Sequence, residues 1–87
     1  MTDLEITRLC ADAMLPDIYL HPKFDPLHDD AQAMALVKKF GIEIHSRTDR
    51  NGWYAGINEE DEMTPHADLN RAICECVAKM QQAKAAA

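Results

Sequence analysis

Two short stretches of alternating apolar and polar residues constrain the fold of this chain most. Residues 42–45 and 53–57 each place apolar side chains at every second position, and Asn51-Gly52 lies between them. Asn and Gly both accept the positive φ angles of a type I′ turn, so the pattern predicts an antiparallel β-hairpin with Asn51-Gly52 in its turn. A two-stranded hairpin is marginal in isolation, so we expect helices to cover its apolar face.

The first predicted helix precedes the hairpin and runs from Asp3 to Met14. Thr2 and Glu5 have the spacing of a capping box, and Pro16 cannot continue a helix. The apolar residues of this segment recur at the spacing of one helical face: Ile6, Leu9, Cys10, Ala13 and Met14.

A second helix is predicted from Asp30 to Phe40. One of residues 28–30 can cap it, and Gly41 supplies the left-handed residue that often ends a helix. Its expected buried face consists of Ala33, Met34, Leu36, Val37 and Phe40. Between the first two helices we expect a mostly irregular connection, in which the alternation of residues 17–20 would allow a very short edge strand at 18–20.

The third predicted helix follows the hairpin. Thr64-Pro65 would start it as a cap followed by a proline at the first helical position, and it would end between Lys79 and Gln82. We expect the tail, residues 82–87, to fray. The apolar face is Leu69, Ala72, Ile73, Cys76, Val77 and Met80.

Together these elements predict a single α+β domain over residues 1–87, a small α/β/α sandwich in the order α-α-β-β-α. A chain of 87 residues buries only roughly 60% of the surface that its unfolded form exposes. Stability is therefore expected to be marginal unless a partner or a homo-oligomer covers more of the surface.

The charge distribution indicates which partners would fit. The net charge is −6, and the acidic residues concentrate in residues 1–30 and 58–68. Binding to a nucleic acid backbone needs a concentrated Lys/Arg surface, so we expect no direct nucleic acid partner. A protein with a basic surface is the better match.

The sequence also bears on location and on metal binding. It shows neither a signal peptide pattern nor an apolar run of the roughly 18 residues that cross a bilayer, so we expect a cytoplasmic protein without membrane contact. Cys10, Cys74 and Cys76 are expected to be reduced thiols. Cys74 and Cys76 would lie about 200° apart on a helix, which disfavours a zinc site. We expect Cys10 and Cys76 to be small core residues, with no metal and no cofactor.

Candidate catalytic residues are few. Asp25, His28 and Asp30 lie in a proline-stiffened loop and could serve acid/base or metal chemistry. Helix capping explains such Asp residues equally simply, and we favour that explanation. Phosphate-binding glycine loops and a nucleophile-elbow serine are absent from the sequence, so we do not expect an enzyme.

An acidic loop and one aromatic residue are better candidates for partner contacts. Glu59 to Glu62 could attract Lys or Arg on another protein, although a merely solvated loop is the simpler alternative. Trp53 and Tyr54 point to opposite faces of their strand, and we assign Trp53 to the core. The residues expected to contact a partner are Tyr54, Glu59, Glu60, Asp61, Glu62, Asp25, Asp29 and Asp30.

Four segments resemble the small phage and prophage proteins of the phage ABA sandwich domain family. They are LEITRLCADAM (4–14), DPLHDDAQAMALVKKFG (25–41), GWYA (52–55) and ADLNRAICECVAKM (67–80). The resemblance implies a helix/sheet/helix sandwich encoded by a phage or prophage. It departs at 15–24, which is shorter than expected of relatives, and the family offers no established catalytic residues to carry over.

Our leading hypothesis from the sequence is a non-enzymatic phage accessory protein. It would bind a bacterial host protein with a basic surface, for example to inhibit a host defence system. The alternative is a small-molecule binding or sequestering protein with a nucleotide-like ligand. A third hypothesis, an enzyme that uses Asp25, His28 and Asp30, requires these side chains to converge in a cleft.

Overall fold

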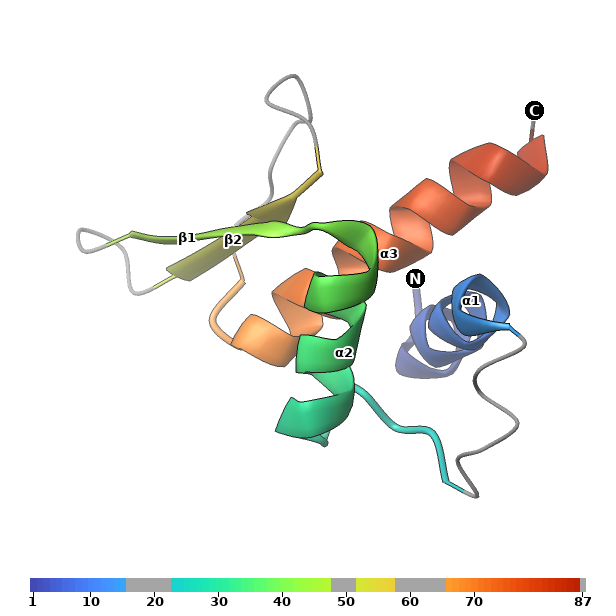
Figure 1. Cartoon of the computed structure of the whole chain (residues 1–87), viewed down its shortest axis with the longest axis horizontal. Helices are drawn as coiled ribbons and strands as arrows, with labels where there is room; N and C mark the ends of the chain where they lie inside the picture. Colours follow the sequence, from blue (N-terminus) through green and yellow to red (C-terminus); the bar gives the residue numbers. More distant parts are fainter. Residues whose placement is uncertain (16–22, 48–51, 58–65, 87) are drawn as a thin grey trace.

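In the described part of the chain, three helices and one antiparallel hairpin follow one another in the predicted order α-α-β-β-α of an α+β fold. The computed structural model in Figure 1 describes residues 1–15, 23–47, 52–57 and 66–86. The elements are α1 (Asp3–Met14), α2 (Asp30–Phe40), β1 (Glu43–Arg47), β2 (Gly52–Gly56) and α3 (Leu69–Ala86). The short edge strand predicted at 18–20 lies outside the described residues.

Helix α1 has the predicted bounds and the predicted cap. The Glu5 backbone N–H donates to Thr2 Oγ1 over 3.2 Å, which satisfies one of the free N–H groups of the first turn. After Met14 the chain turns extended at Leu15. Ile6, Cys10 and Met14 are buried, so the predicted apolar face is confirmed.

Helix α2 also has the predicted bounds, and Asp29 is its N-cap. Gly41 ends it with a φ of 64°, the left-handed conformation that favours glycine. Ala33 and Leu36 are buried, but Met34 is 41% exposed, so its assignment to the buried face is wrong. Met34 lies about 100° around the helix from Ala33 and thus falls beside the face that meets the core.

The hairpin is confirmed as antiparallel, but its turn differs from the prediction. Arg47 pairs with Gly52, so residues 48–51 make the connection and Gly52 is the first residue of β2. A two-residue turn at Asn51-Gly52 would instead pair the residues immediately flanking it. Placing Gly52 in the turn is therefore wrong, and Asn51 lies outside the described residues.

The chain between β2 and α3 makes an unpredicted bridge. The Trp53 N–H donates to the His66 carbonyl over 2.8 Å, and the His66 N–H donates back over 3.0 Å. His66 is therefore extended, and α3 starts at Leu69 with Asp68 accepting from the Arg71 N–H. A helix start at Pro65 is wrong, because Asp68 provides the cap and the bridge requires non-helical backbone at His66. Thr64 and Pro65 themselves lie outside the described residues.

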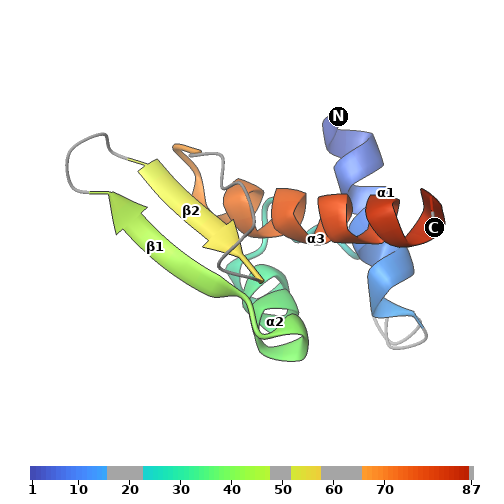
Figure 2. The same cartoon turned by 90° about the horizontal axis from the view of Figure 1, so that it is seen from above.

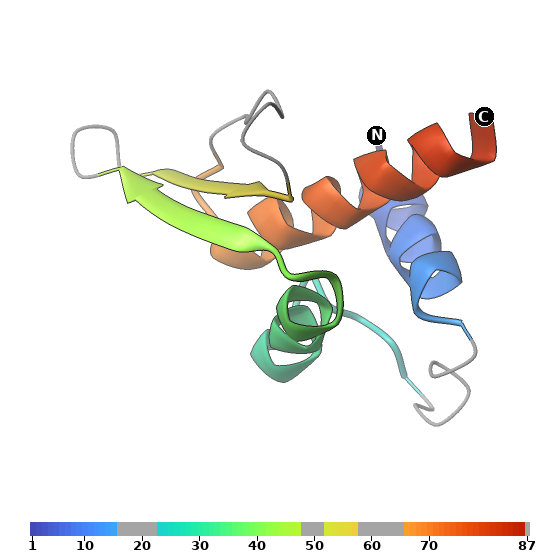
Figure 3. The same ribbon diagram turned by 45° about the horizontal axis from the view of Figure 1, so that its top comes forward.

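Helix α3 contacts α1, α2 and β2, so the core is built around it. Figures 2 and 3 show α1 crossing α3, the hairpin beside the start of α3, and α2 below the hairpin. Because neighbours cover more than one side, α3 buries a wider face than its periodicity predicts. Its buried residues are Ala72, Ile73, Cys74, Val77 and Ala78. It also continues to Ala86, beyond the predicted end near Gln82, in keeping with the high helix propensity of alanine.

Trp53 is only half-buried, which corrects its assignment to the core. Ala55 and Ile57, on the same strand face, do pack against the core. The difference follows from position, because Trp53 is the second residue of β2 and the loop end of the hairpin projects away from the helices (Figure 1). Within the described part of the chain, no helix has the length and apolar character that a bilayer-spanning segment needs.

Candidate functional site

The loop before α2 is held in place by one glutamine. Gln32 donates through its side-chain amide to the Lys23 carbonyl over 2.9 Å and accepts from the Asp25 N–H over 2.5 Å. Its backbone N–H donates to Asp29 Oδ1 over 3.0 Å, which makes Asp29 the helix cap. These bonds fix residues 23–25 against the first turn of α2 and so define the position of Phe24.

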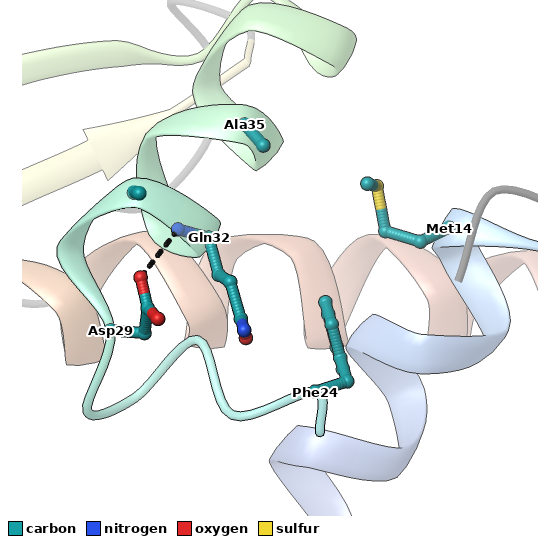
Figure 4. Close-up of a pocket in the computed structure, with 6 residues that line it drawn as sticks. Met14, Phe24, Asp29, Gln32 and Ala35 are labelled. Atoms are coloured by element: carbon teal, nitrogen blue, oxygen red, sulfur yellow. Dashed lines mark hydrogen bonds between the residues drawn. The ribbon is translucent and has the colours of Figure 1, made fainter. Parts of the chain in front are cut away.

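A groove opens where this loop, α2 and the end of α1 meet. It has a volume of about 230 Å³, and Figure 4 shows the side chains around it. Most of its lining is apolar, and the polar groups come from Asp29 and Gln32 at one side. The lining residues are Met14, Phe24, Asp29, Ala31, Gln32 and Ala35. Ala31 and Ala35 are exposed, so the groove is accessible from solvent.

Asp25 and His28 form a pair at the outside of the same loop. His28 Nδ1 lies 3.0 and 3.1 Å from the two Asp25 carboxylate oxygens, and the His28 side chain is 72% exposed. Pro26 and Leu27 are buried between them and anchor the loop. Asp30 does not join this pair, because its Oδ1 accepts from the Asn70 amide of α3 over 2.8 Å.

The Asp30 contact brings the starts of α2 and α3 together. Asp68 caps α3 only two residues before Asn70, so four carboxylates gather around these two helix starts. We refer to Asp25, Asp29, Asp30 and Asp68 as the acidic end. Carboxylates are stabilised near helix N-termini by the helix dipole, and here they also produce a negative surface next to the groove.

The acidic residues predicted to contact a partner are thus partly assembled. Asp25, Asp29 and Asp30 belong to the acidic end, whereas Tyr54 is half-buried on β2. Glu59, Glu60, Asp61 and Glu62 lie outside the described residues. The structure adds Asp68, whose place beside Asp30 depends on the packing of α2 against α3 and so has no signal in the sequence.

A second cluster of charged side chains links α1, α3 and the chain segment at His66. His66 Nε2 is 2.7 Å from Glu75 Oε2, and Arg71 Nε is 3.5 Å from the same oxygen. The contact between His66 and Glu75 is an ion pair only when the His66 imidazole is protonated, and Glu75 Oε2 has no hydrogen-bond partner among the described residues. Arg71 also donates to Asp3 of α1 over 2.6 Å, and this hydrogen bond raises the pKa of the guanidinium. Sequence reasoning missed this cluster, because the bridge places His66 beside Glu75 and the packing of α1 against α3 places Asp3 beside Arg71, and neither contact has a local signal.

All three cysteines lie on helices, and none of them forms a disulfide. Cys10 and Cys74 are buried, and the Cys10 thiol donates to the Cys74 carbonyl over 3.3 Å. Hydrogen bonding with the Cys10 thiol and burial raise the pKa of Cys74 far above that of a free thiol. Cys76, expected in the core with Cys10, is half-buried at its edge. No cluster of His, Cys, Asp and Glu suited to a metal ion occurs among the described residues.

Comparison with known proteins yields no match. No family model matches the chain, and neither a curated protein nor a solved structure is significantly similar to it. The groove and the acidic end are therefore the features from which a function has to be argued.

Proposed function

We propose that this protein acts by binding another protein, a bacterial host protein with a basic surface, and that it carries out no reaction of its own. The observation that carries the proposal is the apolar groove directly beside the acidic end, with Asp29 belonging to both. Protein interfaces combine such features, since buried apolar anchors supply affinity and complementary charges supply orientation and speed of association.

The size of the groove suggests how the partner would be held. A cavity of about 150 Å³ holds a benzene ring. At about 230 Å³ the groove therefore suits one large apolar side chain and not an extended ligand. Lys or Arg residues next to that side chain would meet the acidic end. The partner segment would thus present an apolar anchor flanked by basic residues.

The acid/base alternative receives less support from the geometry. Asp25 and His28 meet at an exposed position, while Asp30 is directed to Asn70, so the three candidates share no cleft. The small-molecule alternative is also weaker for a nucleotide-like ligand, because Asp29 would repel its phosphates and none of the described residues that line the groove is basic. A phage or prophage origin and a role against host defence follow from the sequence resemblance alone.

Capture from bacterial lysate with paired variants tests the proposal. We expect the wild-type protein to retain a host protein at low salt, and to release it as salt screens the charges. Asp25→Asn, Asp29→Asn and Asp30→Asn combined should weaken capture, and Ala35→Phe should block the groove and abolish it. Glu5→Gln, on the exposed first turn of α1, is the control and should leave capture unchanged.

The outcomes separate the two parts of the surface. Loss of capture with Ala35→Phe alone would assign binding to the groove without the charges. Retention of the same host protein by both variants, with each shown to be folded by circular dichroism, would contradict the proposal. A nucleotide that raises the melting temperature of the wild-type protein would favour the small-molecule alternative.

A further inference from the structure

The two edges of the hairpin differ. The outer edge of β2 is closed at Trp53, where two hydrogen bonds of 2.8 and 3.0 Å join it to His66. The outer edge of β1 pairs with no other strand in the part of the chain that the structure describes. Figure 2 shows β1 as the outermost strand, on the side away from α3. An open strand edge is a template for pairing with another chain.

The sequence of β1 is complementary to itself in charge. Its five residues are Glu43, Ile44, His45, Ser46 and Arg47. When two copies run antiparallel about a two-fold axis at His45, Glu43 faces Arg47 of the second copy, and this happens twice. Opposite charges at directly facing positions stabilise a strand pair, whereas like charges destabilise it.

We propose that β1 pairs with β1 of a second copy of this chain, giving a four-stranded antiparallel sheet across a two-fold axis. The same patch would serve both copies, as a two-fold interface requires. The strand offers accessible side chains, since those of Glu43 and His45 are 55% and 58% exposed. Pairing also removes a weakness of the fold, because a two-stranded sheet is marginal and a four-stranded one is not.

The register follows from the length of the strand. A two-fold axis at His45 pairs all five residues, and any displaced axis leaves part of the strand without a partner. A shift of this register by one residue would also place the Ile44 side chains of the two copies on opposite faces of the joined sheet, although Ile44 packs against the core in each copy. Charged residues on an edge strand often prevent pairing. In β1 the order of the charged residues favours pairing. The oligomeric state in solution therefore decides whether these residues prevent pairing or promote it.

Sedimentation equilibrium of the full chain measures that state. A five-residue strand pair is small compared with stable interfaces, so we expect weak association that shows between about 10 µM and about 1 mM protein. The fitted mass should rise from that of one 9.8 kDa chain toward twice that value. A mass that stays at one chain over the whole range would overturn the proposal.

Charge reversal then tests the register. Glu43→Arg and Arg47→Glu each create two like-charged pairs and should weaken self-association about tenfold or more. An equimolar mixture of the two variants restores opposite charges and should form mixed dimers. Glu5→Arg makes the same change of net charge as Glu43→Arg, but on α1, and should leave association unchanged.

Two results would contradict the β1 interface even if the wild-type protein dimerises. One is an unchanged dissociation constant for both reversal variants. The other is a mixture that associates no better than either variant alone. Because Glu43 is exposed, its reversal should leave the melting temperature of the monomer nearly unchanged, so these results report on association and not on folding. The capture experiment above uses a different surface and is independent of this one.

Discussion

The two sides of α3 are built by different means. Where α1 crosses it, the contact is buried, since the Cys10 thiol donates to the Cys74 carbonyl and Ile6, Cys10 and Cys74 are 0% exposed. Where α2 meets it, Asp30 accepts from Asn70 at an exposed position, and Gln32 holds the preceding loop against α2. The first contact offers no surface to a partner. The second leaves the groove and the acidic end open, so we assign stability mainly to the α1 side and recognition to the α2 side.

The largest effect is expected in the buried core of α3. Ile73 is 1% exposed, and Ile73→Ala should lower the free energy of unfolding by about 2–5 kcal/mol through lost burial and the cavity left behind. Met34→Ala removes a side chain of α2 that is 41% exposed and should cost about 1 kcal/mol or less. Urea unfolding followed by circular dichroism gives both values.

A marginal domain could unfold entirely when Ile73 is truncated. Ile73→Val is then the informative variant, with an expected loss of about 0.5–1.5 kcal/mol. A loss for Met34→Ala above about 1.5 kcal/mol, the upper end expected for Ile73→Val, would contradict the division between the buried core of α3 and the accessible surface of α2.

The next effect concerns the buried thiol of Cys74. Its pKa is raised in the folded state, by hydrogen bonding with Cys10 and by burial, so folding favours the protonated thiol. In the unfolded state the Cys74 thiol has a pKa of about 8.5, so it ionises as the pH rises above that value. The unfolded state then binds fewer protons than the folded one, and stability falls as the pH rises above that value. The slope should be about 1.4 kcal/mol per pH unit for this one group.

Cys74→Ala provides the comparison for that measurement. The variant loses some packing at every pH, but its unfolding free energy should decline less steeply than that of the wild type between pH 9 and pH 10. Identical slopes would mean that the Cys74 thiol does not couple ionisation to folding.

Local signals in the sequence were enough for α1, for α2 and for the existence of the hairpin, but not for the bounds of α3. Thr2 as a cap of α1, and Gly41 as the left-handed residue after α2, each act within one turn of backbone. The bounds of both helices were therefore predictable. The register of the hairpin was not, because Asn-Gly marks a preferred turn while the pairing of Arg47 with Gly52 sets a longer connection.

The candidate site likewise has one part that was predictable from the sequence and one part that was not. Asp29 was predictable as a member of a capping group, since its role depends on Gln32, three residues away. The groove depends on Met14 and Phe24 meeting α2, and the acidic end depends on Asp30 reaching Asn70, 40 residues further along the chain. Such contacts arise from tertiary packing, which a periodic pattern does not encode. The burial of Cys74 was missed for the same reason, because it reflects neighbours on a second side of α3.

The smallest effect separates the two roles of Asp29 on the α2 side. Asp29→Ala removes the side-chain cap of α2 and should lower the free energy of unfolding by about 1 kcal/mol. Asp29→Asn keeps a good cap but removes the charge beside the groove, so it should cost only a few tenths of a kcal/mol. Under the proposed function, both variants should weaken capture of the host protein, although only the alanine variant is clearly destabilised. If the asparagine variant captures as well as the wild type, the charge of Asp29 serves the helix and not the partner, and the recognition assigned to the α2 side would then depend on the apolar groove.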